Sequence, residues 1–571
     1  MNKTIRSSTF AMTFVLALVF AATSTLPVLA DGGMIPSTEA PPRGPTSIRS
    51  APSSSKNIAQ VPSGAKIVVV DNEGNKVPLG SQQATAIVNS GDPMWCPDGI
   101  LPVAGNGGCT VSYTGFASLL ADLSAINAGT GVDANGTIWF EDSYVSSIND
   151  PGVSSFTLDG AALTTWAGYS LTLQGGWTGD SSGTISPSGP SQFNGPLNIV
   201  NWKGDVILDN LLVTKANGPG MNVTLTGIGP SANGAGLAIT TTGTVRLSNV
   251  DSIGNLSNGL LIDNRSGPGS VSIDGGNFSD NGQGVMGGLG LYVHSNGAIS
   301  LNNVTANDNR WAGALLFNDD AGANGPITLT GTNVFSGNSD YGAEISSNGN
   351  IWISNLTADK NLHGAYIYNA GGIENVTFSG NNEFNDNFGE GVYVASDGVI
   401  TLHNVTAEDN GEEGALLLNG LRATSSKIVL TGTNVFQGNG GAYPDWYYDL
   451  YIGLNNNVAQ YRNVTTYGDF VLQSLSSDQL PAGLPTDTTF ISALQVVQGA
   501  PIGDVVVSFL VPPDKQNADF SILYWDNTQW RDLSSANFDD GRTVIDPGHL
   551  TNNGYFEATV DFGGIFVLVE K

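Results

Sequence analysis

The chain has 571 residues, 75 of them glycine, and a formal net charge of −30 at pH 7. So acidic a chain is a poor partner for nucleic acid, which binds basic surfaces. Hydrophobic residues make up 40% of the chain and charged residues only 12%, which also excludes a disordered acidic tail.

Residues 1–30 have the pattern of a targeting segment. Lys3 and Arg6 precede the apolar run FAMTFVLALVFAA, and a cleavage-site sequence ends at Ala30. This pattern predicts a secretory signal peptide, because the run is shorter than the roughly 18 apolar residues of a membrane-spanning helix. We therefore expect a secreted, extracellular or cell-surface protein whose mature chain has no transmembrane segment.

Residues 31–60 are rich in Ser and Pro and predict a flexible leader, and residues 61–134 predict an N-terminal cap. In the cap, the turn DNEGN between AKIVVV and KVPLG indicates a hairpin. Cys96 and Cys109 are the two cysteines of the chain and predict one disulfide that closes a loop. A short amphipathic helix is predicted by the helical spacing of the apolar residues Phe116, Leu119, Leu120, Leu123 and Ile126. We expect this helix to cover the open end of the repeats that follow.

Repeats organise residues 135–465 and are clearest from about residue 236 to residue 447. Each begins with a glycine and an alternating apolar run, and short units alternate with long ones. In one copy Leu291 and Val293 alternate with Tyr292 and His294, a period of two that indicates strands. Units this short must stack on their neighbours to bury an apolar side. The opening glycines are Gly236, Gly259, Gly290, Gly313, Gly342, Gly364, Gly391 and Gly414.

Aligned repeats share three columns of residues. Asparagine tolerates left-handed turns, and stacked amides can bond coil to coil. Large residues in long units alternate with small residues in short units, as a dense core requires. The first asparagine column is Asn249, Asn303, Asn355 and Asn404, and the second is Asn255, Asn281, Asn309, Asn338, Asn361, Asn387, Asn410 and Asn439. The size column alternates Ser252, Ala306, Ala358 and Ala407 with Phe278, Phe335, Phe384 and Phe436.

These stacked coils resemble the single-stranded right-handed parallel β-helix (pectate-lyase-like) superfamily, which includes pectate lyases, polygalacturonases, phage tailspikes and bacterial surface proteins. The segments DPMWCPDGILPVAGNGGC and LTLQGGWTG also resemble the start of an uncharacterised type of secreted bacterial β-helix protein. The resemblance implies an all-β, right-handed parallel β-helix solenoid in a bacterial protein. Architecture does not by itself fix function.

The chain beyond the repeats has a different pattern. Residues 466–490 contain LPAGLPTDTT and predict a linker. Residues 491–571 hold alternating apolar runs separated by turn signals, which predict a small C-terminal antiparallel β domain.

Aromatic and apolar residues occupy the outward positions of the strand that opens each repeat. Rings spaced one coil apart could stack on successive sugars of a glycan. Alternatively, loops or the leader cover these rings, or the rings stack on each other across the strands. The candidate ligand-binding residues are Tyr292, His294, Phe317, Tyr366, Tyr368 and Tyr393.

Candidate catalytic residues are few. Asp319 and Asp320 follow a strand, with His363 and His294 on coils on either side of them, which resembles the DD and GHG motifs of polygalacturonases. The NTD and RIK elements of that family are missing, and an acidic pair in a turn is commonly just solvated. We expect no metal site and no cofactor; Ca²⁺ would suit the acidic chain, but no calcium-binding motif is present.

The sequence therefore favours a structural, adhesive or glycan-binding role, with an extracellular polysaccharide or cell-surface glycan as partner. The alternative is a polysaccharide lyase or glycoside hydrolase that acts in a groove on the outer face of the helix. Three or more ionisable side chains converging on that face would favour the enzyme.

Overall fold

The structure is a computed structural model, and the residues it describes all belong to one compact unit, Ala65–Lys571. The predicted signal peptide and leader lie outside the described residues. No helix in the described part is long and apolar enough to cross a membrane. The described residues are 69–70, 76–77, 93–105, 107–129, 132–214, 235–283, 287–369, 371, 373–420, 427–441, 447–462, 464–497, 504–535 and 542–571.

The N-terminal cap begins with the predicted hairpin, in which β1 (Val69–Val70) pairs antiparallel with β2 (Lys76–Val77). Next, β3 (Met94–Pro97) pairs antiparallel with β4 (Gly136–Glu141), the first strand of the repeats. The predicted disulfide joins Cys96 of β3 to Cys109 in the following loop. The loop is therefore fixed to the strand that covers the first coil.

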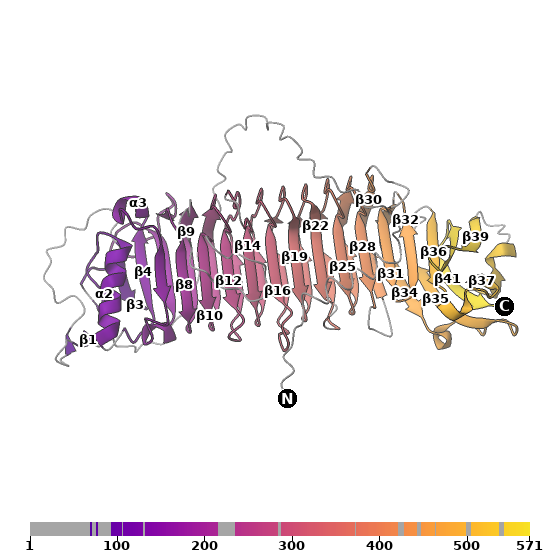
Figure 1. Cartoon of the computed structure of the whole chain (residues 1–571), viewed down its shortest axis with the longest axis horizontal. Helices are drawn as coiled ribbons and strands as arrows, with labels where there is room; N and C mark the ends of the chain where they lie inside the picture. The colour runs from indigo at the N-terminus through magenta and orange to yellow at the C-terminus, as the bar shows by residue number, and fades with distance from the viewer. Residues whose placement is uncertain are drawn as a thin grey trace. The chain divides into compact units, whose positions relative to one another are not determined.

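The predicted amphipathic helix is α2 (Phe116–Gly129), which lies beside β3 and β4 in Figure 1. Phe116, Leu119 and Leu123 are fully buried, and the Phe116 ring centroid lies 4.9 Å from that of Phe140 in β4. The Asp150 carboxylate accepts hydrogen bonds from the Phe116 and Ala117 backbone N–H groups, both at 2.8 Å, so the first turn has bonded donors. The helix thus caps the open end of the core, as predicted.

Three parallel sheets form the repeats, and Figure 1 shows their strands following one another along the unit. The first sheet contains, in spatial order, β5 (Phe156–Asp159), β8 (Leu197–Trp202), β10 (Leu237–Thr241), β12 (Leu260–Asn264), β14 (Leu291–Ser295), β16 (Ala314–Asn318), β19 (Tyr341–Ser347), β22 (His363–Asn369), β25 (Val392–Ser396), β28 (Ala415–Asn419) and β31 (Leu450–Leu454).

The second sheet continues from β4 through β6 (Leu171–Trp177), β9 (Val206–Thr214), β11 (Val245–Ile253), β13 (Val271–Asp274), β15 (Ile299–Asn302), β17 (Ile327–Thr330), β20 (Ile351–Ser354), β23 (Val376–Ser379), β26 (Ile400–His403) and β29 (Lys427–Thr431), with β7 (Ser191–Phe193) also on β9. The third contains β18 (Asn333–Val334), β21 (Leu356–Thr357), β24 (Asn382–Glu383), β27 (Val405–Glu408) and β30 (Thr433–Gln437). The short helices are α3 (Ser146–Asn149), η1 (Trp166–Gly168), η2 (Ser477–Gln479), η3 (Pro513–Lys515) and η4 (Leu533–Ser535).

The strand register confirms the repeat. The residue after each opening glycine pairs with its equivalent in the next coil, as Leu237 does with Leu260 and Leu291 does with Ala314. Leu291 and Val293 are fully buried in the main core, whereas Tyr292 points to the other side of the sheet. The period-two pattern therefore identified both the strands and their inward faces.

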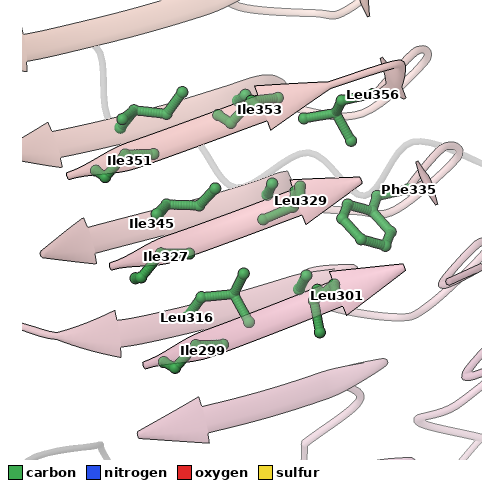
Figure 2. Close-up of a cluster of buried hydrophobic side chains, with 14 of the residues drawn as sticks. Ile299, Leu301, Leu316, Ile327, Leu329, Phe335, Ile345, Ile351, Ile353 and Leu356 are labelled. Atoms are coloured by element: carbon green, nitrogen blue, oxygen red, sulfur yellow. The ribbon is translucent and has the colours of Figure 1, made fainter. Parts of the chain in front are cut away.

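Inside the coils, some columns stack like residues on like and another alternates large with small residues. Figure 2 shows Ile299, Ile327 and Ile351 one above another, with Phe335 filling the corner beneath Leu356. The predicted alternation of large and small residues is present, and Ala407 pairs directly with Phe436. Every member of this column is fully buried, so it is part of the close-packed core.

Both asparagine columns serve the predicted purposes. The first occupies left-handed turns, as at Asn303 with φ 56° and Asn355 with φ 53°. The second forms a continuous ladder: the Asn309 backbone N–H donates to Asn338 Oδ1 at 2.9 Å, and Asn338 repeats this contact with Asn361 at 2.8 Å. The ladder ends on Asp449, whose Oδ1 accepts from the Asn439 backbone N–H at 2.9 Å.

The C-terminal antiparallel region is continuous with the repeats. The first sheet continues beyond β31 with four antiparallel strands, which are in spatial order β32 (Asn457–Tyr461), β36 (Val505–Leu510), β40 (Tyr555–Val560) and β39 (Val544–Leu550). The second sheet continues beyond β29 with five antiparallel strands, which are in spatial order β34 (Phe470–Leu475), β35 (Thr489–Val497), β41 (Gly564–Glu570), β37 (Phe520–Trp525) and β38 (Trp530–Asp532). The third ends in β33 (Val464–Tyr467). Antiparallel strands thus cover the edges that the last coil would expose.

This continuity differs from the expected linker at residues 466–490. Within that range β34 pairs antiparallel with β29, and Phe470 and Leu472 are buried in the common core. Turns with Pro and Gly occupy only the later part of the range, where residues 480–488 connect η2 to β35. The sequence LPAGLPTDTT therefore marks a connection between two paired strands.

Candidate functional site

The candidate site is the outer face of the first sheet, meaning the side chains of β12 to β28 that point away from the core. Because these strands are parallel, their N-terminal ends lie along one edge and their C-terminal ends along the other. A strand of about five residues separates the two edges by roughly 15 Å. The face therefore has an N-terminal edge, a central column and a C-terminal edge.

The central column contains a stacked pair of tyrosines. Tyr366 of β22 is in register with Tyr393 of β25, and their ring centroids lie 4.4 Å apart with planes 2° from parallel. Tyr341 lies beside Tyr366 at 5.7 Å. All three rings are half-buried, as is Tyr368 toward the C-terminal edge of β22. Tyr366 and Tyr393 therefore stack on each other across the strands, which is the alternative to glycan binding named above, and the ring surface outside this contact meets solvent.

The earlier coils of the same column are closed. Tyr292 is only 1% exposed and packs with Leu261 and Leu315 in a small apolar cluster outside the main core. Phe317 is half-buried, and its ring centroid lies 5.6 Å from that of Tyr292. Of the predicted rings, Tyr292 is therefore buried, whereas Phe317, Tyr366, Tyr368 and Tyr393 are half-buried.

At the C-terminal edge, His294 of β14 faces Asp319 and Asp320, which follow β16. His294 Nε2 lies 3.9 Å from Asp319 Oδ1 and 3.4 Å from Asp320 Oδ2. Tyr292 Oη and His294 Nδ1 are hydrogen bonded at 3.0 Å, and Ser346 Oγ donates to Asp319 Oδ2 at 2.7 Å. Burial, followed by the charge of the nearby Arg265, lowers the pKa of His294.

The Arg265 charge is paired. Its Nε and Nη2 atoms donate to the Asp263 carboxylate at 3.0 and 2.7 Å. Burial would raise the pKa of Asp263, but the hydrogen bonds from Arg265 outweigh it and lower the pKa. The two side chains thus form a nearly neutral unit beside His294.

At the N-terminal edge, His363 is the first residue of β22, and Glu390 lies just before β25. His363 Nδ1 is 2.5 Å from Glu390 Oε2. Burial alone would lower the pKa of His363, but the hydrogen bond and charge of Glu390 raise it. Burial would likewise raise the pKa of Glu390, but His363 lowers it. The pair is therefore an ion pair at mildly acidic pH, and Tyr341 stacks on the imidazole at 5.2 Å.

Two further carboxyls join Glu390. Oxygens of Glu390, Glu412 and Glu413 all lie within 4.8 Å of one another. Burial, with the charges of Glu390 and Glu412, raises the pKa of Glu413 to about 8. Burial, with the charges of Asp340 and Asp319, similarly raises the pKa of Glu344 in the central column to about 7. Ionised and protonated carboxyls thus coexist at neutral pH, as acid–base chemistry requires.

Sequence analysis placed both His294 and His363 near Asp319 and Asp320, and the structure brings only His294 to them. Asp319 and Asp320 meet His294, whereas His363 meets Glu390. The reason is the position along the strand: Asp319 follows the C-terminal end of β16, while His363 is the first residue of β22. Adjacent coils bring residues together only when they share an edge.

Sequence analysis missed Glu390, Glu412 and Glu413. Glu390 and Glu413 each stand immediately before a glycine that opens a repeat, Gly391 or Gly414. That shared position is the signal that could have found them, since equivalent positions of adjacent coils are neighbours in space. Glu412 lies one residue further from the glycine.

Residues 289–458 match the family model described as "Right handed beta helix region". Together with the parallel coils described above, this match identifies the fold of the repeats as a right-handed parallel β-helix. No curated protein matches the sequence.

Several solved structures are similar to the chain at low sequence identity. The A-module of the mannuronan C-5 epimerase AlgE4 from Azotobacter vinelandii is 14% identical, with 52% of this chain and 78% of that chain covered and a TM-score of 0.26. The periplasmic alginate epimerase AlgG is 12% identical, with 69% and 96% covered and a TM-score of 0.28. The tailspike protein gp49 of Acinetobacter baumannii bacteriophage Fri1, a capsular polysaccharide depolymerase, is 10% identical, with 77% and 93% covered and a TM-score of 0.23.

Proposed function

We propose that the outer face of the first sheet binds a polysaccharide outside the cytoplasm. The observation that carries this proposal is the half-buried, parallel pair Tyr366 and Tyr393, one coil apart, with the His363–Glu390 pair beside it. A sugar ring presents apolar C–H groups to an aromatic face and hydroxyls to charged neighbours. Rings in the centre with polar groups along the edge match that combination.

The charges on the face favour a neutral polysaccharide. Carboxyl groups predominate on this face. At its C-terminal edge, the cation Arg265 is already bonded to Asp263. Like charges across an interface oppose binding, so a polyuronate would be disfavoured. The carboxylates instead accept hydrogen bonds from sugar hydroxyls.

A location outside the cytoplasm rests on two features. The buried Cys96–Cys109 disulfide suits an oxidising compartment. The N-terminal stretch up to Ala30 has the pattern of a secretory signal peptide.

The test is a panel of neutral and anionic polysaccharides, scored for retention of the purified protein and for release of products. We expect retention on at least one neutral polysaccharide. The double substitution Tyr366→Ala and Tyr393→Ala should weaken binding roughly 5- to 150-fold, from about 0.5–1.5 kcal/mol for each ring. The matched control is Tyr467→Ala on the third sheet, where the ring is 59% exposed.

Two results would refute binding at this face. One is a parent protein that is retained by none of the polysaccharides. The other is a double variant that folds as the parent does and binds with unchanged affinity.

A second candidate function is hydrolysis of the bound polysaccharide. It is favoured by the convergence of His363 with Glu390, Glu412 and Glu413, which meets the criterion of three ionisable side chains given above. It is also favoured by the opposite pKa shifts of Glu390, which is lowered, and Glu413, which is raised to about 8. Such a pair supplies a base and an acid in one place at neutral pH. Glu413→Gln should then abolish product release and leave retention unchanged. If the parent releases no product from any polysaccharide that it binds, the face serves for binding alone.

A further inference from the structure

The group formed by His294, Asp319 and Asp320 has a feature that the polysaccharide proposal does not use. His294 is 9% exposed, and its Nε2 is a buried nitrogen with no hydrogen-bond partner among the described residues. This atom faces the two carboxylates. A buried polar atom without a partner is costly, so a group that binds there would be favoured.

The distances fit three atoms that share one ion. Zn²⁺ binds imidazole nitrogen and carboxylate oxygen at about 2.0–2.2 Å, which places two tetrahedral ligands about 3.4 Å apart. His294 Nε2 lies 3.4 Å from Asp320 Oδ2 and 3.9 Å from Asp319 Oδ1. All three side chains offer ligand atoms within 4.8 Å of one another.

Neighbouring groups hold these side chains in place. The hydrogen bond between Tyr292 Oη and His294 Nδ1 leaves Nε2 directed at the carboxylates. Ser346 Oγ occupies Asp319 Oδ2, so that Oδ1 is the oxygen that faces the histidine. Partners of this kind orient the ligands of protein metal sites.

We infer that His294, Asp319 and Asp320 bind a divalent transition-metal ion. One imidazole and two carboxylates match the donor preferences of Zn²⁺ and Mn²⁺, whereas an all-oxygen site would suit Ca²⁺ or Mg²⁺. The two carboxylates neutralise the ion, and the charge of Arg265 is offset by Asp263. Three protein ligands leave room for water or a bound molecule on the ion.

Sequence analysis placed His294 on a coil beside the acidic pair but expected no metal site there. The histidine and the acidic pair are 25 and 26 residues apart, and only the stacking of β14 under β16 brings them together. The inference is independent of the polysaccharide proposal, because its test uses the metal ion alone.

The test is calorimetric titration of Zn²⁺, Mn²⁺ and Ca²⁺ into the full chain, without an affinity tag and after treatment with a chelator. We expect a Zn²⁺ or Mn²⁺ site of higher affinity than any Ca²⁺ site, and its loss in His294→Gln. Tyr292→Phe removes one hydroxyl and should weaken metal binding roughly 10- to 100-fold. The matched control is His403→Gln, since His403 bonds Thr431 on the second sheet and should leave binding unchanged.

Asp320→Asn provides a second variant if His294→Gln fails to fold, because the Asp320 side chain is 46% exposed and lies in a turn. It should weaken binding at least about 10-fold, as loss of a ligand does. The inference is overturned if the parent binds neither Zn²⁺ nor Mn²⁺ at millimolar concentration. It is also overturned if the folded variants at His294 or Asp320 bind these ions as the parent does.

Discussion

His363 and Glu390 form an ion pair across two adjacent coils, with Nδ1 and Oε2 2.5 Å apart. The two side chains are only 28% and 23% exposed, so water screens the pair less than it would screen a surface pair. Each partner shifts the pKa of the other toward its charged form. This relationship predicts how stability depends on pH.

We expect the pair to stabilise the fold most between about pH 4.5 and 6.5. The raised pKa of His363 gives stability that is full below its unfolded value and is lost as pH rises through the folded one. The lowered pKa of Glu390 gives stability that is full above its unfolded value and is lost as pH falls through the folded one. His363→Gln should therefore reduce the free energy of unfolding by about 1–2 kcal/mol at pH 5.5 and by less at pH 9. Equal losses at both pH values in denaturant titrations would contradict this account.

Glu344 predicts a loss of stability with rising pH, which is opposite in direction to the effect of Glu390. The pKa of Glu344 is raised by burial to about 7, so the folded state holds a proton that the unfolded state releases from about pH 4.5 upward. Stability should fall as pH rises from 4.5 to 7. Glu344→Gln should flatten this slope, and thermal melts of parent and variant across that range would show it. A variant with the same slope as the parent would rule out Glu344 as its source.

The alternating core column predicts the result of overpacking. Ala358 is fully buried between coils that carry Phe335 and Phe384. Ala358→Phe would place three large rings in succession, and we expect a loss of roughly 1–3 kcal/mol. The neighbouring outward residue Thr357 is the control, because Thr357→Phe adds the same ring outside the core. Equal stability of both variants in chemical denaturation would refute the packing argument.

The asparagine ladder predicts a cost for any broken step. Asn338→Ala removes the acceptor of the Asn309 backbone N–H and leaves that buried donor unpaired. We expect a loss of about 1–3 kcal/mol. Asn350, which is on the surface and accepts from the Asn375 N–H, provides a control that should cost less. Hydrogen exchange should show faster exchange at Asn309 in the Asn338 variant, and unchanged protection there would contradict the ladder.

Features that repeat could be predicted from the sequence. The opening glycines and the second asparagine column recur in every unit, whereas the first asparagine column and each residue type of the size column recur in every second unit. Each position was therefore observed several times within one chain. Strand direction, inward faces and coil register all followed from these columns. The same stacking then fixed which core residues meet.

Features that occur once could not be predicted in this way. His363 was grouped with Asp319 because coil order alone does not show which edge of the sheet a residue occupies. The burial of Tyr292 likewise depends on Leu261 and Leu315. These two residues belong to the neighbouring repeats, so the sequence of one repeat does not show that the three side chains pack together. The position of β34 on β29 required knowledge of how the last coil ends.

The asparagine ladder has a direction. At every step the backbone N–H of one coil donates to the side-chain oxygen of the next, from Asn255 onward. Asparagine side chains add a second row of donors, since Nδ2 of Asn309 also donates to Asn338 Oδ1 and Nδ2 of Asn338 donates to Asn361 Oδ1, whereas the carboxylate of Asp449 can only accept. Asp449 therefore ends the side-chain row: an aspartate placed earlier would keep its backbone N–H donor but would have no side-chain amide to donate to the next coil.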